Sequence, residues 1–276
     1  MKTYWFVIAA AVACLTSLSS AEWKVEKDLP YYTEEELNAS ADEYRRGRCK
    51  LDVRYPEGGT NVPVLVWFHG GGLSGGNKHF KDLGEDPVIQ VAVNYRLGPR
   101  AAFPAYLEDA ARAVVWTLRS IERYGGDPKR VIVSGHSAGG YLSAMIALDP
   151  RWLAKFGANP NELLGVAPIS GQMTEHFNVK KWMGDTGPQY RPLINERAPM
   201  YYLSADAIPI CLILGDRRIE WACRVEENAL MAASLKKLGA KRVEFHEIRG
   251  ANHGTVAKKG LPLLRAFIRS LTQPTQ

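Results

Sequence analysis

The sequence predicts an α/β protein whose core is a doubly wound, mostly parallel sheet with helices on both faces. Two patterns lead to this prediction: short apolar runs recur along the chain, and amphipathic helical segments separate them. Strands buried on both faces of a parallel sheet are nearly continuous in apolar residues, and strand–helix alternation is typical of such sheets. The 276 residues are 46% hydrophobic and 23% charged, which suits a globular core. Because no repeat or linker interrupts the pattern, residues 22–276 are predicted to form a single domain.

The strands are predicted from the apolar runs, taken in chain order. Cys49–Tyr55 alternates apolar with charged residues, as a half-buried strand does, and a Pro-Glu-Gly-Gly turn follows it. Val62–Phe68 is then almost wholly apolar, which predicts a strand buried on both faces. The remaining predicted strands share this short apolar character and are Val88–Tyr95, Val131–Ser134, Leu164–Ile169, Ile210–Leu214 and Val243–Ile248.

The predicted helices fill the segments between these strands. Tyr106–Arg123 is the clearest, because its apolar residues repeat at helical spacing along one face. The other main helices are predicted over Ser137–Leu148, Val225–Leu238 and Thr255–Leu271. The polar segment Glu22–Arg48 has only weak helical character, around Thr33–Arg45. Residues 171–206 form a long irregular segment, which predicts a small lid over the site.

The first 21 residues have the pattern of a secretory signal peptide. Lys2 is their only charged residue, the apolar run Tyr4–Leu15 follows, and small residues precede a predicted cleavage after Ala21. The run is shorter than the roughly 20 apolar residues that a membrane-spanning helix needs, so no stable membrane span is expected. The sequence therefore predicts a secreted or periplasmic protein. Two alternatives are a lipoprotein anchored through Cys14, although the usual leucine three residues earlier is missing, and a buried N-terminal helix.

Charge and cysteine content argue against a nucleic-acid partner and a structural zinc site. The formal net charge is +6, and acidic residues are interleaved with the basic ones, so the sequence shows no basic stripe for nucleic acid. Cys49, Cys211 and Cys223 follow the signal segment without the Cys-x-x-Cys or Cys/His spacing of a zinc site. One disulfide between any two of them is compatible with export, and its pairing stays open.

A G-x-S-x-G motif, Gly135-His136-Ser137-Ala138-Gly139, lies between a predicted strand and a predicted helix. In that setting the turn is tight and strained, and the small residues let the backbone close while the serine hydroxyl stays exposed. The start of the helix also directs backbone N–H groups toward charge that develops beside the serine. An ordinary Gly/Ser turn is the alternative, but it does not require this setting. Ser137 is therefore the predicted nucleophile.

A glycine run, His69-Gly70-Gly71-Gly72, follows the predicted buried strand Val62–Phe68. Successive glycines leave backbone N–H groups uncovered, so no side chain keeps a substrate at a distance. The N–H groups of Gly71 and Gly72, together with that of Ala138, are predicted to form an oxyanion hole. A phosphate-binding loop is the alternative, but the Lys-Ser/Thr pair that it needs is missing.

The general base is expected late in the chain. His253 lies in a loop just past the predicted strand Val243–Ile248 and next to Gly254, where it can reach the serine across the sheet edge. His136 and His69 lie inside the two glycine motifs and are predicted to be supporting residues. The remaining histidines lack such a setting and are expected on the surface or in the core; they are His79, His176 and His246.

With these residues in view, the chain resembles the α/β-hydrolase superfamily, in the branch of hormone-sensitive-lipase-like esterases and bacterial acetyl-xylan or feruloyl esterases. The matching stretches cover most of residues 60–255 and are His69–Gly72, Asn94–Leu97, Phe103–Ala105 with Glu108-Asp109, Gly125–Pro128, Gly135–Gly140, more loosely Ala198–Asp206, and Asn252–Gly254. The resemblance implies the α/β-hydrolase fold. It also implies ester hydrolysis through an acyl-enzyme, with no metal or organic cofactor.

The acidic member of the implied triad departs from the family pattern. In the family the acid usually stands three residues after the glycine that ends the strand, and here Gly215 is that glycine, which puts Arg218 at the position. Asp216 comes earlier, and Glu220 slightly later. Glu220 is the predicted acid, because its longer side chain can reach under His253, and Asp216 is the alternative. An incomplete triad in a slow or inactive enzyme is the third interpretation.

The residues and the resemblance together predict a secreted serine carboxylic-ester hydrolase. Its expected partner is a small-molecule or polysaccharide-linked ester, with either a short acyl group or a link to carbohydrate. Two alternatives remain open at this point. One is a non-catalytic binding protein with the α/β-hydrolase fold, since a fold does not determine function. The other is a formamidase-like amidase.

Overall fold

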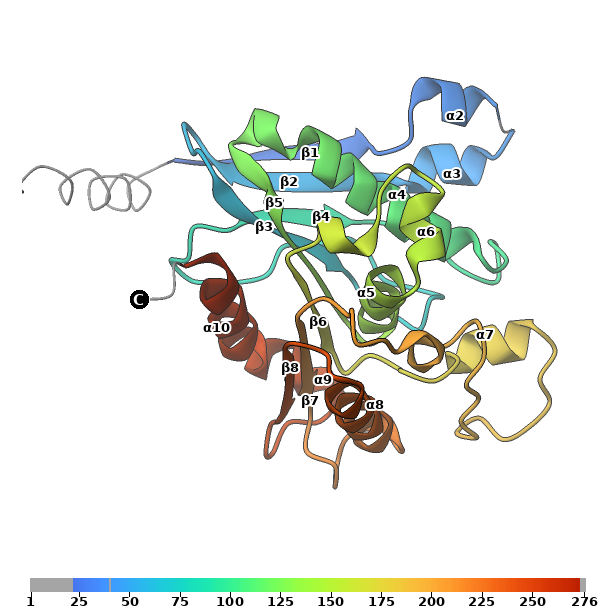
Figure 1. Cartoon of the computed structure of the whole chain (residues 1–276). Helices are drawn as coiled ribbons and strands as arrows, with labels where there is room; N and C mark the ends of the chain where they lie inside the picture. The colour runs from blue at the N-terminus through green and yellow to red at the C-terminus, as the bar shows by residue number, and fades with distance from the viewer. Residues whose placement is uncertain (1–21, 40, 274–276) are drawn as a thin grey trace, which may run out of the picture.

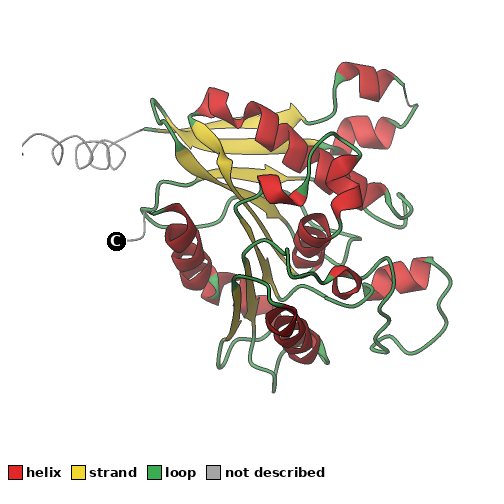
Figure 2. Cartoon of the chain, viewed as in Figure 1, coloured by secondary structure: helices red, strands yellow, loops and turns green. Residues whose placement is uncertain are grey.

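The computed structural model describes residues 22–39 and 41–273 and contains one twisted sheet between two layers of helices (Figures 1 and 2). The predicted signal segment, with Cys14, lies outside the described residues. Within residues 22–39 and 41–273, no helix is both long enough and apolar enough to cross a membrane. The predicted doubly wound, mostly parallel sheet is confirmed.

The sheet has eight strands in the order β1-β2-β4-β3-β5-β6-β7-β8. β2 is antiparallel to β1 and β4, and every pair from β4 to β8 is parallel. The bounds are β1 (Trp23–Pro30), β2 (Lys50–Pro56), β3 (Val62–Phe68), β4 (Ile89–Val93), β5 (Gly126–His136), β6 (Gly165–Ile169), β7 (Ile210–Leu214) and β8 (Val243–Glu247). β3 and β7 begin and end at the predicted residues, whereas β5 begins earlier than predicted.

The helices cover both faces of the sheet. Their bounds are α2 (Glu34–Asn38), α3 (Glu43–Arg48), α4 (Ala105–Ser120), α5 (Ala138–Leu148), α6 (Pro150–Ala154), α7 (Phe177–Trp182), α8 (Arg224–Leu238), α9 (His253–Lys259) and α10 (Leu261–Thr272). Three short 3₁₀ helices are η1 (Ile121–Tyr124), η2 (Pro160–Glu162) and η3 (Pro199–Tyr202). Along β3, Val64, Val66 and Phe68 join the core under α4, α5 and α8, while Leu65 and Trp67 join the core under α9 and α10. This alternation explains why the whole strand is apolar.

Several predictions about the termini and the cysteines need correction. The segment Glu22–Arg48 contains an unpredicted edge strand, β1, whose side chains are mostly exposed and therefore show no apolar alternation. The predicted helix Thr255–Leu271 is two helices, because Pro262 has no N–H with which to continue the first one past Gly260. The three described cysteines, left open for one disulfide, are all free.

Residues 171–206 are irregular apart from α7 and η3, and they project from the side of the domain in Figure 1. The segment leaves the sheet at the end of β6 and returns to it at β7. It therefore lies at the edge where the parallel strands end. Its role as a lid stays a prediction.

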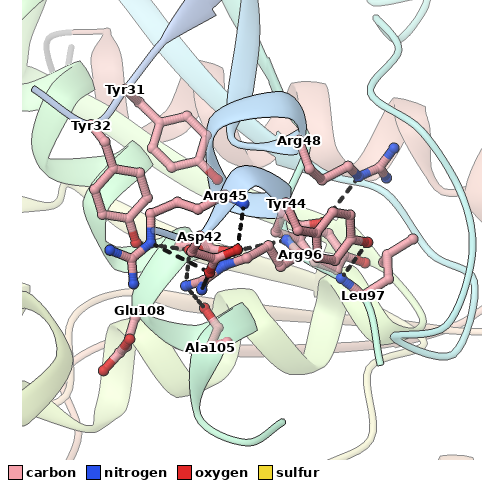
Figure 3. Close-up of polar contacts among 12 residues, drawn as sticks. Tyr31, Tyr32, Asp42, Tyr44, Arg45, Arg48, Arg96, Leu97, Ala105 and Glu108 are labelled. Carbon is pink, nitrogen blue, oxygen red and sulfur yellow. Dashed lines mark hydrogen bonds and ion pairs between the residues drawn. The ribbon is translucent and has the colours of Figure 1, made fainter. Parts of the chain in front are cut away.

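A buried ion pair joins the end of β4 to α4 and to the N-terminal segment. The guanidinium of Arg96 donates to both carboxylate oxygens of Asp109, at 2.7 and 2.8 Å, and also to Asp42 Oδ2 at 2.6 Å. Tyr32 donates its hydroxyl proton to Asp109 Oδ1 at 2.7 Å. Figure 3 shows Arg96 and Asp42 at the centre of this group, with Tyr44 and Leu97 beside them. Because Asp109 is fully buried, these contacts must compensate its charge.

Asp109→Asn should lower the free energy of unfolding by about 3 kcal/mol, because among residues 22–39 and 41–273 it leaves the buried Arg96 with Asp42 as its one carboxylate partner. Chemical denaturation at neutral pH measures the change. The matched control is Arg119→Gln, which removes the exposed pair with Glu162 and should cost at most about 1 kcal/mol. Equal losses in the two variants would show that the buried pair does not hold these elements together.

Candidate active site

The predicted nucleophile lies in the turn between β5 and α5. Ser137 has φ 57° and ψ −116°, a conformation that costs a non-glycine residue on the order of 1–3 kcal/mol. The two glycines that flank Ser137 have no room for a side chain. A Cβ on Gly139 would lie 2.0 Å from the Phe68 carbonyl oxygen, and one on Gly135 would lie 2.5 Å from Gly139. Ala138 is the first residue of α5, so its N–H precedes the helical hydrogen bonds. The turn therefore presents a serine hydroxyl beside a helix N-terminus.

Ser137, His253 and Glu220 form a continuous hydrogen-bonded chain. The Ser137 hydroxyl donates to His253 Nε2 at 2.9 Å, and His253 Nδ1–H donates to Glu220 Oε1 at 2.6 Å. His253 begins α9 after β8, and Glu220 lies in the loop after β7. The carboxylate acceptor fixes the proton on Nδ1, which leaves the Nε2 lone pair facing the serine. The structure thus brings together three residues that are predicted from distant segments of the sequence.

Glu220 is held as a carboxylate by three donors. Besides His253, the hydroxyl of Ser170 donates to Oε2 at 2.6 Å, and the backbone N–H of Trp221 donates to Oε1 at 2.9 Å. Burial opposes ionisation of this side chain, but the hydrogen bonds outweigh burial and lower its pKa to about 2. Glu220 is therefore negatively charged at neutral pH.

Asp216, the alternative acid, has a different set of partners. Its carboxylate accepts from the Arg218 guanidinium at 2.6 and 2.9 Å and from the backbone N–H of Gly250 at 2.9 Å. Arg218 holds the pKa of Asp216 well below its usual range. The side chain thus ties the loop after β7 to the loop before His253. Of the two predicted carboxylates, the structure places Glu220 against the imidazole and Asp216 in the supporting loop.

The glycine run lies beside Ser137. A Cβ on Gly70 would lie 3.4 Å from Ser137 Cβ, so the two backbones are in close contact. Gly71 has φ 113° and Gly72 φ 62°, and their N–H groups have no acceptor among the described residues. The Asn178 amide donates to the Gly72 carbonyl oxygen at 2.6 Å, which turns that peptide's oxygen toward α7. The loop therefore offers free N–H donors at the serine, as an oxyanion hole requires.

The loop is held by side chains from two other segments. Tyr95 donates its hydroxyl proton to the His69 carbonyl oxygen at 2.8 Å, and the two rings stack with centroids 4.4 Å apart. Arg48 donates to His69 Nε2 at 3.2 Å, so Nδ1 carries the proton that His69 donates to the Gly70 carbonyl oxygen at 2.7 Å. Burial and the Arg48 charge lower the pKa of His69 to about 4. A neutral His69 thus closes the start of the loop.

His136 also supports the site. Its Nε2–H donates to the backbone carbonyl oxygen of His253 at 2.9 Å, and burial together with the neighbouring His253 lowers its pKa to about 4. His79, His176 and His246 lie outside the hydrogen-bonded chain: His79 is exposed, His176 accepts the Asn178 N–H at the start of α7, and His246 pairs with Glu244.

Three functional neighbours were not predicted from the sequence. They are Ser170, Trp221 and Arg48, and each contacts a predicted site residue. Each contact joins residues at least 21 positions apart in the chain, apart from the Trp221 N–H bond to the adjacent Glu220. The sequence carried no local signal for them, except that Trp221 directly follows the candidate acid.

A second polar cluster lies at the β7–β8 edge, away from the serine. The ligand atoms of Cys211, Glu244 and His246 fall within 4.8 Å of one another, close enough to consider a metal ion. Arg242, however, donates to Glu244 Oε1 at 2.7 Å, and burial raises the pKa of the Cys211 thiol. A guanidinium and a neutral thiol oppose cation binding, so we interpret the cluster as an ion pair beside a core cysteine.

A mostly apolar cavity of about 280 Å³ lies between residues 171–206 and the start of α8. Phe177, Tyr190 and Leu230 are among its lining residues. A Cβ on Gly72 would lie 3.7 Å from Phe177 Cζ, so this wall of the cavity adjoins the glycine loop. A larger hollow of about 520 Å³ lies at the opposite end of the parallel strands, between the turn after β2 and the start of β5.

Two protein-family models match the chain. The prolyl oligopeptidase family model matches residues 108–267, and a model described as BD-FAE matches residues 51–152. Together they span the glycine run, the G-x-S-x-G motif, the acid loop and His253.

Two curated relatives of the chain are named as esterases. The probable carboxylic ester hydrolase LipM of Mycobacterium tuberculosis is 28% identical over 70% of this chain and 49% of its own length, and esterase LipQ of the same organism is 26% identical over 71% and 51%. The chain thus spans about half the length of these curated relatives.

Among solved structures, an esterase from Pyrobaculum calidifontis has a TM-score of 0.62 at 21% identity, covering 95% of this chain and 88% of its own. A truncated carbohydrate esterase from gut microbiota has a TM-score of 0.68 at 14% identity, covering 92% and 98%. The predicted α/β-hydrolase fold is confirmed by these structures. Since the matching family model covers more than half of the sequence, the chain belongs to the prolyl oligopeptidase family of α/β-hydrolases.

Proposed function

We propose that this protein is a serine carboxylesterase that cleaves esters through an acyl-enzyme on Ser137. The hydrogen-bonded chain from Glu220 through His253 to Ser137 carries the proposal, because it supplies a nucleophile, a general base and an orienting carboxylate. The carboxylic-ester hydrolases among the relatives support the same chemistry.

The reaction begins when a substrate carbonyl carbon lies next to the serine. His253 Nε2 takes the Ser137 proton while Oγ attacks the carbonyl carbon, and the oxygen becomes an oxyanion. The N–H groups of Gly71, Gly72 and Ala138 stabilise this oxyanion.

The acyl-enzyme forms when the tetrahedral intermediate collapses. The imidazolium of His253 gives its proton to the departing alcohol, and the ester bond to the alcohol breaks. Water then repeats the sequence on the acyl-enzyme, with His253 again acting as the base. Glu220 stays ionised throughout and stabilises the imidazolium in both steps.

For the substrate, we propose small-molecule esters with short acyl groups or polysaccharide-linked esters. The signal-like first 21 residues, which favour export to a place where polymeric substrates are found, support this class. A neighbour in fold is described as a carbohydrate esterase, which also supports it. Rates of hydrolysis measured on p-nitrophenyl esters of increasing acyl length, and on acetylated and feruloylated polysaccharides, show which of these esters the protein cleaves.

Amide hydrolysis is the second candidate, because the matching family is named for a peptidase and the same three residues can attack an amide. Parallel assays on p-nitrophenyl acetate and on peptide p-nitroanilides decide between ester and amide. A non-catalytic binding protein is disfavoured by the complete hydrogen-bonded chain, since a binding protein has no need of it.

Ser137→Ala should lower kcat for p-nitrophenyl acetate by roughly 10⁶, the loss seen when a comparable triad loses its nucleophile. Ser204→Ala, which changes an exposed serine remote in sequence from the G-x-S-x-G motif, is the control and should keep wild-type activity. Circular dichroism checks that both variants fold. Retention of more than about a tenth of the wild-type kcat in folded Ser137→Ala protein would contradict the assignment.

Glu220→Gln should lower kcat/KM by about 10⁴, because the amide cannot stabilise the imidazolium although it fills the same space. Asp216→Asn is the matched control. It should keep kcat/KM within about tenfold, since that carboxylate does not contact His253, but it should lower the melting temperature by loosening the two loops. The reverse ranking of the two variants would make Asp216 the acid.

Wild type and Glu220→Gln, compared with each other, also give a pH test. Glu220 has a folded-state pKa of about 2, below its ordinary value of 4.5, so it contributes to stability above pH 4.5 and loses that contribution as the pH falls toward 2. Unfolding of wild type and Glu220→Gln, compared across this range, should therefore converge at low pH. A constant difference would mean that the carboxylate is not stabilised in the folded protein.

A further inference from the structure

One face of the His253 imidazole is covered by an indole ring. The rings of Trp221 and His253 are stacked, with centroids 4.1 Å apart and planes 14° from parallel. Trp221 directly follows Glu220 in the chain, and its backbone N–H donates to Glu220 Oε1, the oxygen that also accepts from His253. A single residue thus contacts the imidazole through its side chain and the orienting carboxylate through its backbone.

The indole is itself held by two elements. The Phe177 ring of α7 packs edge-on against it at 5.8 Å, and the Arg224 guanidinium at the start of α8 lies 5.8 Å from its centroid. Trp221 remains 39% exposed, so the core does not require this side chain. An exposed tryptophan that is nevertheless fixed against a histidine indicates a role in the site.

We propose that Trp221 is a positioning residue for the general base: its indole fixes the plane of the His253 ring and stabilises the imidazolium that forms when Ser137 loses its proton. The inference rests on the proposed function. A cation within about 6 Å of an indole centroid and over its face is attracted by the ring electrons, and tryptophan is the strongest of the aromatic side chains in this respect. The stacked geometry places the ring atoms that share the positive charge over that face.

How strongly the Trp221 indole stabilises His253 depends on the charge of the imidazole. This dependence determines whether Trp221 affects kcat or KM. The neutral imidazole of the resting enzyme gains little from the indole, whereas the imidazolium of the transition state gains more. An interaction made mainly in the transition state raises kcat and leaves KM almost unchanged. A tryptophan that merely bound substrate would affect KM instead.

Three other side chains face the His253 imidazole. An effect of Trp221 substitution on the pH dependence of kcat/KM must be separated from the contributions of these groups. Glu220 faces Nδ1, Ser137 faces Nε2, and the His136 ring lies 4.9 Å from the His253 ring, tilted by 41°. The low pKa values of Glu220, about 2, and of His136, about 4, keep both groups in one charge state near neutral pH. Among the groups named here, His253 is therefore the one beside Trp221 whose charge changes during the proposed reaction.

The test compares Trp221→Leu, which keeps apolar bulk without a ring, with Trp221→Phe, which keeps a ring face. Trp221→Leu should lower kcat about tenfold, with KM within about twofold, and Trp221→Phe should recover most of the loss. The acidic limb of the kcat/KM profile should move to lower pH by about half a unit in Trp221→Leu, since the protonated imidazole has lost its stabilising partner. Trp23→Ala, at the edge strand β1 and also beside an arginine, is the matched control and should show none of these changes.

The rate at which a fluorophosphonate labels Ser137 is measured in the same proteins, because it reports on the base without any ester substrate. It should fall in Trp221→Leu and recover in Trp221→Phe. Wild-type kcat in Trp221→Leu, an equal loss in both variants, a change in KM alone or an unmoved acidic limb would each overturn the inference. If wild type itself neither hydrolyses esters nor is labelled at Ser137, the proposed function fails instead. Should Trp221→Leu not fold, the smaller pH shift expected of Trp221→Phe decides.

Discussion

The close contact between the end of β3 and the start of α5 is the constraint on which the site depends. The Phe68 carbonyl oxygen lies where a Cβ of Gly139 would otherwise be, so β5 can turn into α5 only through glycines and a strained serine. The Ser137 backbone N–H donates to the Ile169 carbonyl oxygen of β6 at 2.9 Å, which holds the strained residue in place. Strain of this kind persists because the surrounding packing determines it.

Parallel topology then brings the remaining groups to the same edge. β3, β5, β7 and β8 are parallel, so their carboxyl ends lie along one edge of the sheet, where the glycine run follows β3, the acid loop follows β7 and the loop that leads to α9 follows β8. The acid loop accepts hydrogen bonds from segments on both sides: Ser170, just after β6, donates to Glu220, and Gly250, between β8 and α9, donates to Asp216. The geometry of the candidate site is therefore a property of the sheet and its loops together.

Part of this arrangement could be predicted from the sequence, for identifiable physical reasons. The bounds of β3 are predictable to the residue because burial on both faces makes the entire strand apolar, and the serine turn is recognisable because its glycines are sterically required. The expected contact of Glu220 with His253 rested on side-chain reach, and the structure brings the two together.

Other features left no local pattern. β1 lies at the sheet edge with exposed side chains, so it lacks the alternation that reveals a half-buried strand. Ser170 and Arg48 act through contacts with residues far along the chain, and an ordinary serine or arginine gives no sign of such a partner. The acid loop is the exception, because Trp221 directly follows the candidate acid Glu220 and so indicates an aromatic neighbour for His253.

In the proposed mechanism Ser137 carries the acyl group during turnover. Rapid acid quenching of the reaction with p-nitrophenyl acetate, followed by peptide mass spectrometry, identifies the acylated residue, because the intermediate is trapped on the residue that formed it. We expect one acetyl group on the peptide that contains Ser137, at a level that rises with the initial burst of p-nitrophenol. An acetyl group on another residue, such as the exposed Cys223, with Ser137 unmodified during turnover, would contradict it.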